Sequence, residues 1–406
     1  MTIADMTKTK ILEIENVISH TDIDEVGISL FSGYGGVPLF YFMLYKLTND
    51  KAYILKTQKS YEKLFEKIND ENYDYTITYC NGLVGFAYLT HFLTKQGILD
   101  SDSMQENLEM IDKIVYENTI EEINSIDDID FLHGALGVAF YLNERQADNP
   151  TIKTSTKLLF EKISDIIIES VKDAKKNENI TEINQDTHKV NCGMAHGYVS
   201  YISILSGFLL NNGVNDKVKN AIDKSLDLLL SFETENCNAF SVYPGIAVNQ
   251  KTAIYNIPLG WCYGDQTISL ILYKVSNIFK SDSLYTKALA LARRNLSRNT
   301  YDKMFPVTLF DEAFCHGLAS VAYLHKKWYK ITGDEKFYNL YEFLIKDIVE
   351  RGDKIDGLAG YKKIINRNET INSIGLLDGV VGIGIVLIDY LLGDNNTGWD
   401  SFFLLD

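Results

Sequence analysis

The sequence predicts an all-α protein, an α/α toroid in which seven inner helices are surrounded by seven outer helices. Three observations support this prediction. A glycine motif occurs seven times, a run of small and apolar residues follows each glycine, and the last copy is the most apolar of all. Successive motif glycines are 49 to 67 residues apart, which leaves room for two helices and their loops in each repeat.

The seven copies share a leading glycine and a helical run in which polar residues are few. They read SGYGGVPLF, NGLVGFAYL, HGALGVAFYL, HGYVSYISIL, YGDQTISLIL, HGLASVAYL and DGVVGIGIVL. Their leading glycines are Gly33, Gly82, Gly134, Gly197, Gly264, Gly317 and Gly379. A helix that is apolar on all sides is buried, whereas the second helix of each repeat is amphipathic, as in residues 336–350. We therefore expect the motif helices to be the inner ones.

Closure into a ring explains how one domain, residues 1–406, can include the whole chain. A ring buries every inner helix against its neighbours, so it can exceed the usual size of a single core. An open helical solenoid is the alternative, and its terminal repeats would need a polar capping face. The last copy, from Gly379 to Leu392, is instead strongly apolar, which favours the ring.

The composition is that of a soluble globular protein, with 46% hydrophobic and 23% charged residues. A net charge of -16 argues against a nucleic-acid partner. The N-terminal residues have no apolar signal core, and no run approaches the roughly 18 apolar residues that span a bilayer. Five cysteines without regular spacing are a poor disulfide framework. We expect a cytoplasmic protein with reduced thiols that is not integral to a membrane.

The repeat predicts where chemistry occurs, because the residues before each glycine lie at helix N-termini around one mouth of the ring. The residues one before the glycine are Ser32, Asn81, His133, His196, Tyr263, His316 and Asp378. The residues two before are Phe31, Cys80, Leu132, Ala195, Cys262, Cys315 and Leu377. Three of the five cysteines and three of the seven histidines fall in these positions. We expect the repeat to bring these side chains together.

Cys262, Cys315 and His316 are the candidate metal ligands. Two thiolates and one imidazole are a normal ligand set for zinc, with the fourth position open for water or substrate. A helix N-terminus also favours the thiolate form of cysteine. The alternative is that the cysteines are small apolar core residues and the histidine is a hydrogen-bonded core residue.

Four segments resemble the signature motifs of the lanthionine synthetase C-like family. They are GWCYGD (260–265), FCHG (314–317), MAHG (194–197) and DFLHG (130–134). The resemblance covers nearly the whole chain and implies an α/α toroid with a central zinc. It also implies that Cys262, Cys315 and His316 ligate the zinc. His196, Asp130 and Tyr263 match positions that the family uses around the metal.

The sequence departs from this family at two places. Members commonly carry an arginine four residues before the first cysteine ligand, where this chain has Pro258. Many members have a proline-glycine or similar small pair after the tyrosine-glycine, where this chain has Asp265, Gln266 and Thr267. Both differences concern the segment that would orient the substrate.

The implied reaction is the addition of a peptide cysteine thiol to dehydroalanine or dehydrobutyrine. Zinc would supply the thiolate, and an enolate forms that must be protonated at Cα. We expect His196 to donate that proton, since imidazole titrates near neutral pH, and Asp130 to hold its ring. Tyr263 is expected to hydrogen-bond the enolate oxygen. Asp130 could instead cap a helix and Tyr263 could only line the cavity.

Three other functions stay open on the sequence. The chain could add a small thiol such as glutathione to dehydrated protein sites, or it could be a non-catalytic peptide-binding scaffold. A glycosidase of the α/α-ring type would need a carboxylate pair, for which Asp130 and Asp378 are candidates, although the cysteine-rich centre argues against it. For the cyclase, the expected partners are a dehydrated precursor peptide, a separate dehydratase and a peptide transporter. Such a complex would place the protein at the inner face of the membrane.

Overall fold

The structure is a computed structural model that describes residues 1–71, 73–177, 180, 187–306 and 309–406. The chain forms two compact units. The terminal unit consists of Met1–Ile111 and Leu309–Asp406, and the middle unit is Asp112–Thr308. Among the described residues, no helix is both long and apolar enough to cross a membrane. The prediction of a single domain over residues 1–406 stays a prediction.

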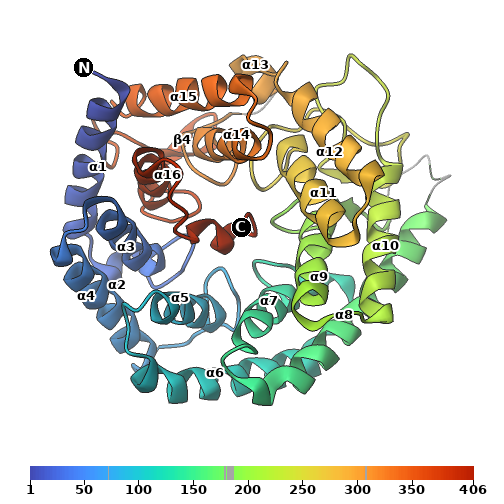
Figure 1. Cartoon of the computed structure of the whole chain (residues 1–406), viewed down its shortest axis with the longest axis horizontal. Helices are drawn as coiled ribbons and strands as arrows, with labels where there is room; N and C mark the ends of the chain where they lie inside the picture. The colour runs from blue at the N-terminus through green and yellow to red at the C-terminus, as the bar shows by residue number, and fades with distance from the viewer. Residues whose placement is uncertain (72, 178–179, 181–186, 307–308) are drawn as a thin grey trace. The chain divides into compact units, whose positions relative to one another are not determined.

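Most helices of the terminal unit pack in pairs, which Figure 1 draws in the blue and red colours of the two chain ends. Its helices are α1 (Ile3–Ser19), α2 (Ile23–Val26), η1 (Tyr34–Gly36), α3 (Val37–Thr48), α4 (Lys51–Ile68), α5 (Leu83–Lys95), α14 (Leu318–Thr332), α15 (Glu335–Glu350), α16 (Val380–Leu392) and η4 (Trp399–Phe403). The helix α6 (Ser101–Glu122) begins in this unit and ends in the middle unit. Within the terminal unit α3 packs on α4, α14 on α15, and α16 on α1.

The middle unit repeats the same arrangement in green and yellow (Figure 1). Its helices are η2 (Ile126–Ile129), α7 (Ala135–Arg145), η3 (Pro150–Ile152), α8 (Lys153–Lys176), α9 (Tyr198–Asn212), α10 (Asp216–Ser231), α11 (Asp265–Phe279), α12 (Asp282–Asn295) and α13 (Tyr301–Met304). Each motif helix packs on the helix that follows it, as α7 does on α8, α9 on α10, and α11 on α12.

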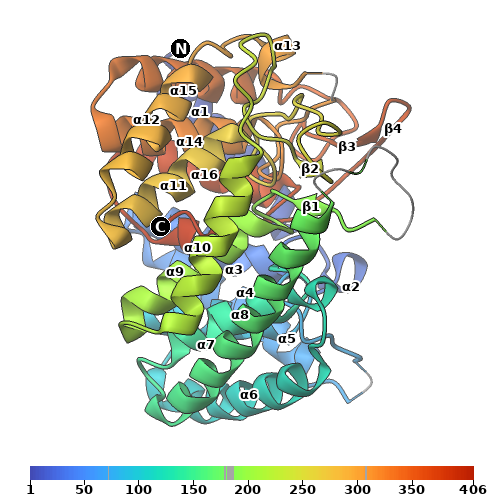
Figure 2. The same cartoon turned by 90° about the vertical axis from the view of Figure 1, so that its right-hand side faces the viewer.

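Strands are short and lie in the loops. In the middle unit β1 (Val190–Asn191) pairs antiparallel with β2 (Ile246–Ala247). In the terminal unit β3 (Lys363–Asn366) and β4 (Glu369–Ile371) form an antiparallel hairpin. Figure 2 shows this hairpin as a projecting arm, and every residue of β4 is exposed. The rest of the described secondary structure is helical, as the sequence predicts.

The motif glycines begin the buried helices. Six of the seven are N-cap residues of α-helices, whereas Gly33 is the N-cap residue of the 3₁₀ turn η1, so that α3 begins only at Val37. The inner helices are buried on nearly all sides; α16, for example, buries every residue from Val380 to Asp389. By contrast, α15 buries only the face that carries Phe337, Tyr341, Leu344, Ile345, Ile348 and Val349.

Close backbone approach explains why the motif position is glycine. A Cβ on Gly197 would lie 2.1 Å from the carbonyl oxygen of Asn191, and a Cβ on Gly82 would lie 2.0 Å from that of Thr76. The backbone of Gly197 is extended, so any residue could adopt its φ. The loop before each helix therefore folds back onto the glycine, which fixes the residues just before it at the helix N-terminus.

A buried polar network in the middle unit gives a stability prediction. The carboxylate of Asp112 is fully buried and accepts hydrogen bonds from Tyr141 (2.6 Å), Arg145 (3.0 Å to Nη2) and Asn149 (2.9 Å). The Asp112→Ala variant leaves the buried guanidinium of Arg145 without its carboxylate, so the free energy of unfolding should fall by about 3–5 kcal/mol. Denaturant unfolding followed by circular dichroism measures this loss.

The neighbouring Lys113 is the matched control, because its side chain is exposed and its ion pair with Glu117 is long, at 3.9 Å. Lys113→Ala should change the unfolding free energy by less than about 0.5 kcal/mol. Equal midpoints for the Asp112 and Lys113 variants would show that the network does not stabilise the middle unit.

Candidate active site

Asp130 and His196 form a close pair in the middle unit. The Nδ1 atom of His196 lies 2.6 Å from Oδ2 of Asp130, across 66 residues of sequence. His196 directly precedes the N-cap glycine of α9, and Asp130 is the C-cap residue of η2. A carboxylate on Nδ1 fixes the orientation of the imidazole and leaves Nε2 as the atom that exchanges a proton. The sequence predicts this pairing, and the structure brings the two residues together.

The loops on both sides hold this pair in place. The other oxygen of Asp130 accepts the backbone N–H of His133 at 2.7 Å, within the turn that leads to α7; because Gly134 is the N-cap residue of α7, this bond does not cap the helix. The ring of His133 lies nearly parallel to that of His196, with 5.8 Å between centroids. The side chain of His196 is 37% exposed and that of Asp130 is 20% exposed, so solvent or substrate can reach the pair.

A cavity of about 760 Å³ opens beside the pair, within the middle unit. Besides Asp130 and His196 it is lined by polar and aromatic side chains, among them Asp127, Asp173, His188, Asn191, Tyr198 and Tyr201. Burial raises the pKa of Tyr198 to about 12 and also raises that of Tyr201, so both hydroxyls are neutral hydrogen-bond donors at physiological pH. The cavity has the size of a small-molecule or peptide-segment site.

Tyr263 is tied to the loop that precedes His196. Its hydroxyl accepts a hydrogen bond from Nδ2 of Asn191 at 2.9 Å, and its ring packs so closely on Gly193 that a Cβ there would lie 2.6 Å away. The N–H of Met194 also donates to the carbonyl oxygen of Cys262 at 2.8 Å. These contacts place the segment that carries Cys262 and Tyr263 beside the segment that carries His196.

Asn191 is a site residue that the sequence reasoning missed. It lies in β1, lines the cavity and orients the hydroxyl of Tyr263. Its own Oδ1 accepts the N–H of Gly193 at 2.8 Å, which closes the turn ahead of His196. Asn191 lies six residues before the motif glycine Gly197, and the structure places its carbonyl oxygen against that glycine. This fixed spacing from the glycine is the signal that could have identified it.

Asp265 and Arg298 hold the loop that carries Cys262. Asp265 is the first residue of α11, and its buried carboxylate accepts the N–H groups of Val242 (2.7 Å) and Tyr243 (3.1 Å). Arg298 lies 3.8 Å from Asp265 and donates to the carbonyl oxygen of Ile257 at 2.6 Å. Burial raises the pKa of Asp265 and lowers the pKa of Arg298 to about 10.

The pair of Asp265 and Arg298 gives a structural role to one of the two sequence departures, the one that begins at Asp265. Asp265 is the first residue of the departure after Gly264, and it anchors the segment 242–243 to the start of α11. Arg298 fixes the backbone directly before Pro258. Arg298 could not have been found from the motifs, because it follows α12 and lies outside every repeat position.

Cys315 and His316 lie together at the start of α14 in the terminal unit. The N–H of Cys315 donates to the carbonyl oxygen of Leu377 at 2.8 Å. The hydrogen bond between the side chains of Cys315 and His316 raises the pKa of His316 to about 9. Ligation requires a neutral imidazole and a thiolate, so binding of a metal by this pair would release the imidazole proton.

Cys262, Cys315 and His316 are a donor set that could hold a metal ion. Cys262 belongs to the middle unit, where it is 6% exposed, and the other two belong to the terminal unit. Two sulfurs and one imidazole nitrogen fit zinc, and they fit the hard cations Mg²⁺ and Ca²⁺ poorly.

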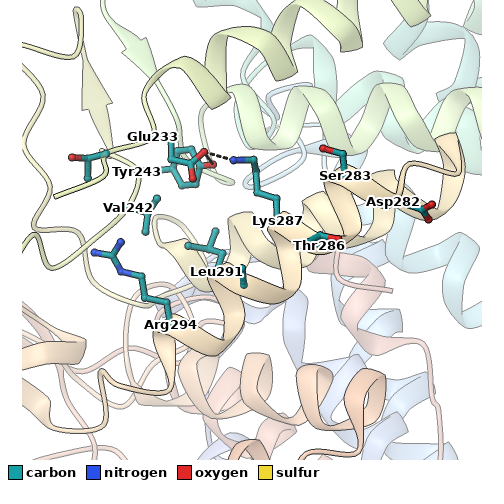
Figure 3. Close-up of a pocket in the computed structure, with 11 residues that line it drawn as sticks. Glu233, Val242, Tyr243, Asp282, Ser283, Thr286, Lys287, Leu291 and Arg294 are labelled. Carbon is teal, nitrogen blue, oxygen red and sulfur yellow. Dashed lines mark hydrogen bonds and ion pairs between the residues drawn. The ribbon is translucent and has the colours of Figure 1, made fainter. Parts of the chain in front are cut away.

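A second cavity, of about 580 Å³, lies along α12 in the middle unit. An ion pair between Lys287 and Glu233 crosses it, and Tyr243, Leu291 and Arg294 line it (Figure 3). None of the site residues predicted from the sequence is among its lining residues. The cavity beside Asp130 and His196 is therefore the better candidate for the chemistry.

The comparisons with known proteins agree with the motifs. A family model described as lanthionine synthetase C-like protein matches residues 24–404. Among solved structures, one described as nisin cyclase matches with a TM-score of 0.72 and 20% sequence identity, covering 97% of this chain and 96% of that chain. The likeness shows a common fold and confirms the predicted all-α toroid. No curated protein matches the sequence.

Proposed function

Because the chain belongs to the lanthionine synthetase C-like family, we propose that it is a zinc-dependent lanthionine cyclase. It would add cysteine thiols of a peptide to dehydroalanine or dehydrobutyrine residues of the same peptide, which forms thioether rings. The main support is the pair of Asp130 and His196 on a cavity of about 760 Å³ beside the loop of Cys262 and Tyr263. The family and the fold support a cyclase-type function, and the residue roles below are our proposal.

The metal would be held by Cys262, Cys315 and His316. When bound, zinc supplies a Lewis acid that lowers the pKa of a substrate thiol and so makes the thiolate available at neutral pH. The hydrogen bond of Cys315 to His316 supports this assignment, because it places a sulfur and an imidazole at one helix N-terminus. The helix dipole there further favours a thiolate.

The side chains of the middle unit complete the addition. The thiolate sulfur forms a bond to Cβ of the dehydroamino acid, and the electron pair of the double bond moves onto the carbonyl oxygen as an enolate. His196 then delivers a proton from Nε2 to Cα, while Asp130 holds the ring through Nδ1. Tyr263, whose hydroxyl accepts a hydrogen bond from Asn191, can donate its own proton in a hydrogen bond to the enolate oxygen.

The proposed substrate also defines the partners. A peptide reaches this protein only after its serines and threonines have been dehydrated, so we propose that a separate dehydratase supplies it. A transporter that exports the finished peptide would place the protein in a complex at the inner face of the membrane, on the cytoplasmic side. This part of the proposal depends on the proposed chemistry.

An assay on a pre-dehydrated precursor peptide tests the function. Ring formation conserves mass, so the readout is the loss of thiols that can be alkylated, followed by mass spectrometry. We expect thiol loss with purified zinc-loaded protein and none with the Cys262→Ala/Cys315→Ala variant. Thiols that stay alkylatable unless glutathione is added would show intermolecular addition instead. Peptide binding without either reaction would show a scaffold.

A further inference from the structure

Tyr201 is a buried tyrosine of the middle unit that the proposed mechanism does not use. It lies in the first turn of α9, four residues after the motif glycine Gly197, and it is only 4% exposed. Even so, it lines the cavity of about 760 Å³ beside Asp130 and His196. A polar group therefore lies on the wall of the candidate active site without an assigned role.

The hydroxyl of Tyr201 has no hydrogen-bond partner among the described residues, although its ring is packed against that of Tyr198, with 5.0 Å between centroids. Its oxygen is not one of the described polar atoms that are sealed within the core, so it is reached from the cavity. Buried polar groups are nearly always hydrogen-bonded. A hydroxyl that lacks a partner at the wall of a cavity is available to a ligand.

Tyr198 shows what the other outcome looks like on the same wall. It lies one turn before Tyr201 in α9, lines the same cavity and is 2% exposed. Its hydroxyl, however, is 2.9 Å from Oγ of Ser170, which in turn lies 3.2 Å from Nε2 of His188. The two tyrosines have similar burial, but only the hydroxyl of Tyr198 is bonded within the fold.

The surroundings of the Tyr201 hydroxyl indicate what it binds. Burial raises the pKa of Tyr201, and the neighbouring Tyr198 and Asp130 raise it further, so the hydroxyl stays protonated and can donate. Asp127, which also lines the cavity, acts in the same direction. The two carboxylates repel an anionic ligand, so the fitting acceptor is a neutral oxygen. A peptide carbonyl that enters a cavity loses its water and needs such a donor.

We infer that the hydroxyl of Tyr201 donates a hydrogen bond to a backbone carbonyl oxygen of the dehydrated peptide and so holds the peptide beside His196. The inference rests on the proposed cyclase function. The proton stays on the tyrosine oxygen throughout, and no covalent bond changes at this residue. Tyr201 is thus a substrate-binding residue whose contact is made equally in the ground state and in the transition state.

The competing explanation is that Tyr201 only fills the core and leaves its hydroxyl in the water of the cavity. Tyr201→Phe separates the two explanations, because phenylalanine keeps the packed ring and removes only the oxygen. Under the competing explanation peptide affinity is unchanged. Under the inference a peptide carbonyl is left in the cavity without its donor, and affinity falls.

The experiment compares Tyr201→Phe with the wild-type protein and with a matched control, Tyr341→Phe. The hydroxyl of Tyr341 is also buried without a partner among the described residues, but it lines neither of the two cavities described above. The measurements are the dissociation constant of a dehydrated precursor peptide whose cysteines are replaced by alanine, the single-turnover rate of thiol loss at saturating peptide, and the midpoint of denaturant unfolding. Tyr198→Phe is added for the unfolding measurement.

We expect Tyr201→Phe to raise the dissociation constant by about 3- to 10-fold, the effect of removing one hydrogen bond of a neutral group. The rate at saturating peptide should stay within about two-fold of wild type, because the contact is made equally in both states. The unfolding midpoint should not fall, whereas Tyr198→Phe should lower it, since only Tyr198 loses a hydrogen bond within the protein. Tyr341→Phe should match the wild-type affinity and rate.

An unchanged dissociation constant in Tyr201→Phe would overturn the inference, and so would an unfolding midpoint that falls as far as in Tyr198→Phe. A slower rate at unchanged affinity would also overturn it, because the hydroxyl would then act on the transition state. A wild-type protein that binds the peptide but shows no thiol loss would refute the proposed function alone, so the two failures are distinguishable.

Discussion

Replacement of His196 by asparagine should slow thiol addition by about 10²–10⁴, the range expected for a positioned general acid. Asparagine can still contact Asp130, but it cannot deliver a proton to Cα. Zinc content and fold should be unchanged, because His196 is outside the proposed ligand set. Single-turnover thiol loss, measured beside elemental analysis, checks both parts of this expectation.

Two further variants make the His196 result specific. His133→Asn is the matched control, since His133 occupies the same motif position, has its ring 5.8 Å from that of His196 and should leave the rate nearly unchanged. Asp130→Asn should cost less than His196→Asn, because Asp130 only orients the imidazole. Wild-type turnover in His196→Asn would remove the histidine from the mechanism. A variant without zinc would show that the ligand set is misassigned.

Replacement of Cys315 by alanine should abolish zinc binding and cyclisation together. Two remaining protein ligands hold zinc poorly, and a structural contribution of the metal would be lost as well. The measurements are elemental analysis, thiol loss and the thermal melting temperature, which should fall. Cys237→Ala is the control, because Cys237 is exposed and lies outside the motif positions, so it should retain zinc. Stoichiometric zinc in the Cys262→Ala/Cys315→Ala variant would contradict the assignment.

The helical repeat was predictable because its cause is local. Each motif glycine is required by a loop that folds back onto it, and six of the seven are N-cap residues of a buried helix. The first repeat differs since residues 34–36 form a 3₁₀ turn before α3. The pairing of Asp130 with His196, across 66 residues, was implied by the family resemblance and not by the periodicity, because Asp130 lies outside the positions one and two before a motif glycine.

Contacts without a periodic signal were not predictable. The strands β1 and β2 have two residues each, and they form because the fold of the middle unit brings Val190 beside Ala247. Arg298 lies outside the repeat positions, and its partner Asp265 is distant in sequence. The sequence therefore indicated that Pro258 and Asp265 depart from the family, but only the structure shows that Arg298 lies beside Asp265 and bonds the carbonyl oxygen of Ile257.

Analysis of the reaction product tests the central claim most directly. A dehydrated precursor peptide is incubated with zinc-loaded protein in the absence of small thiols, then alkylated and fragmented by tandem mass spectrometry. The account predicts a product of unchanged mass, with no alkylated cysteine and no backbone fragments from between the joined residues. A peptide that is alkylated at every cysteine and fragments along its whole length would show that the protein forms no thioether rings.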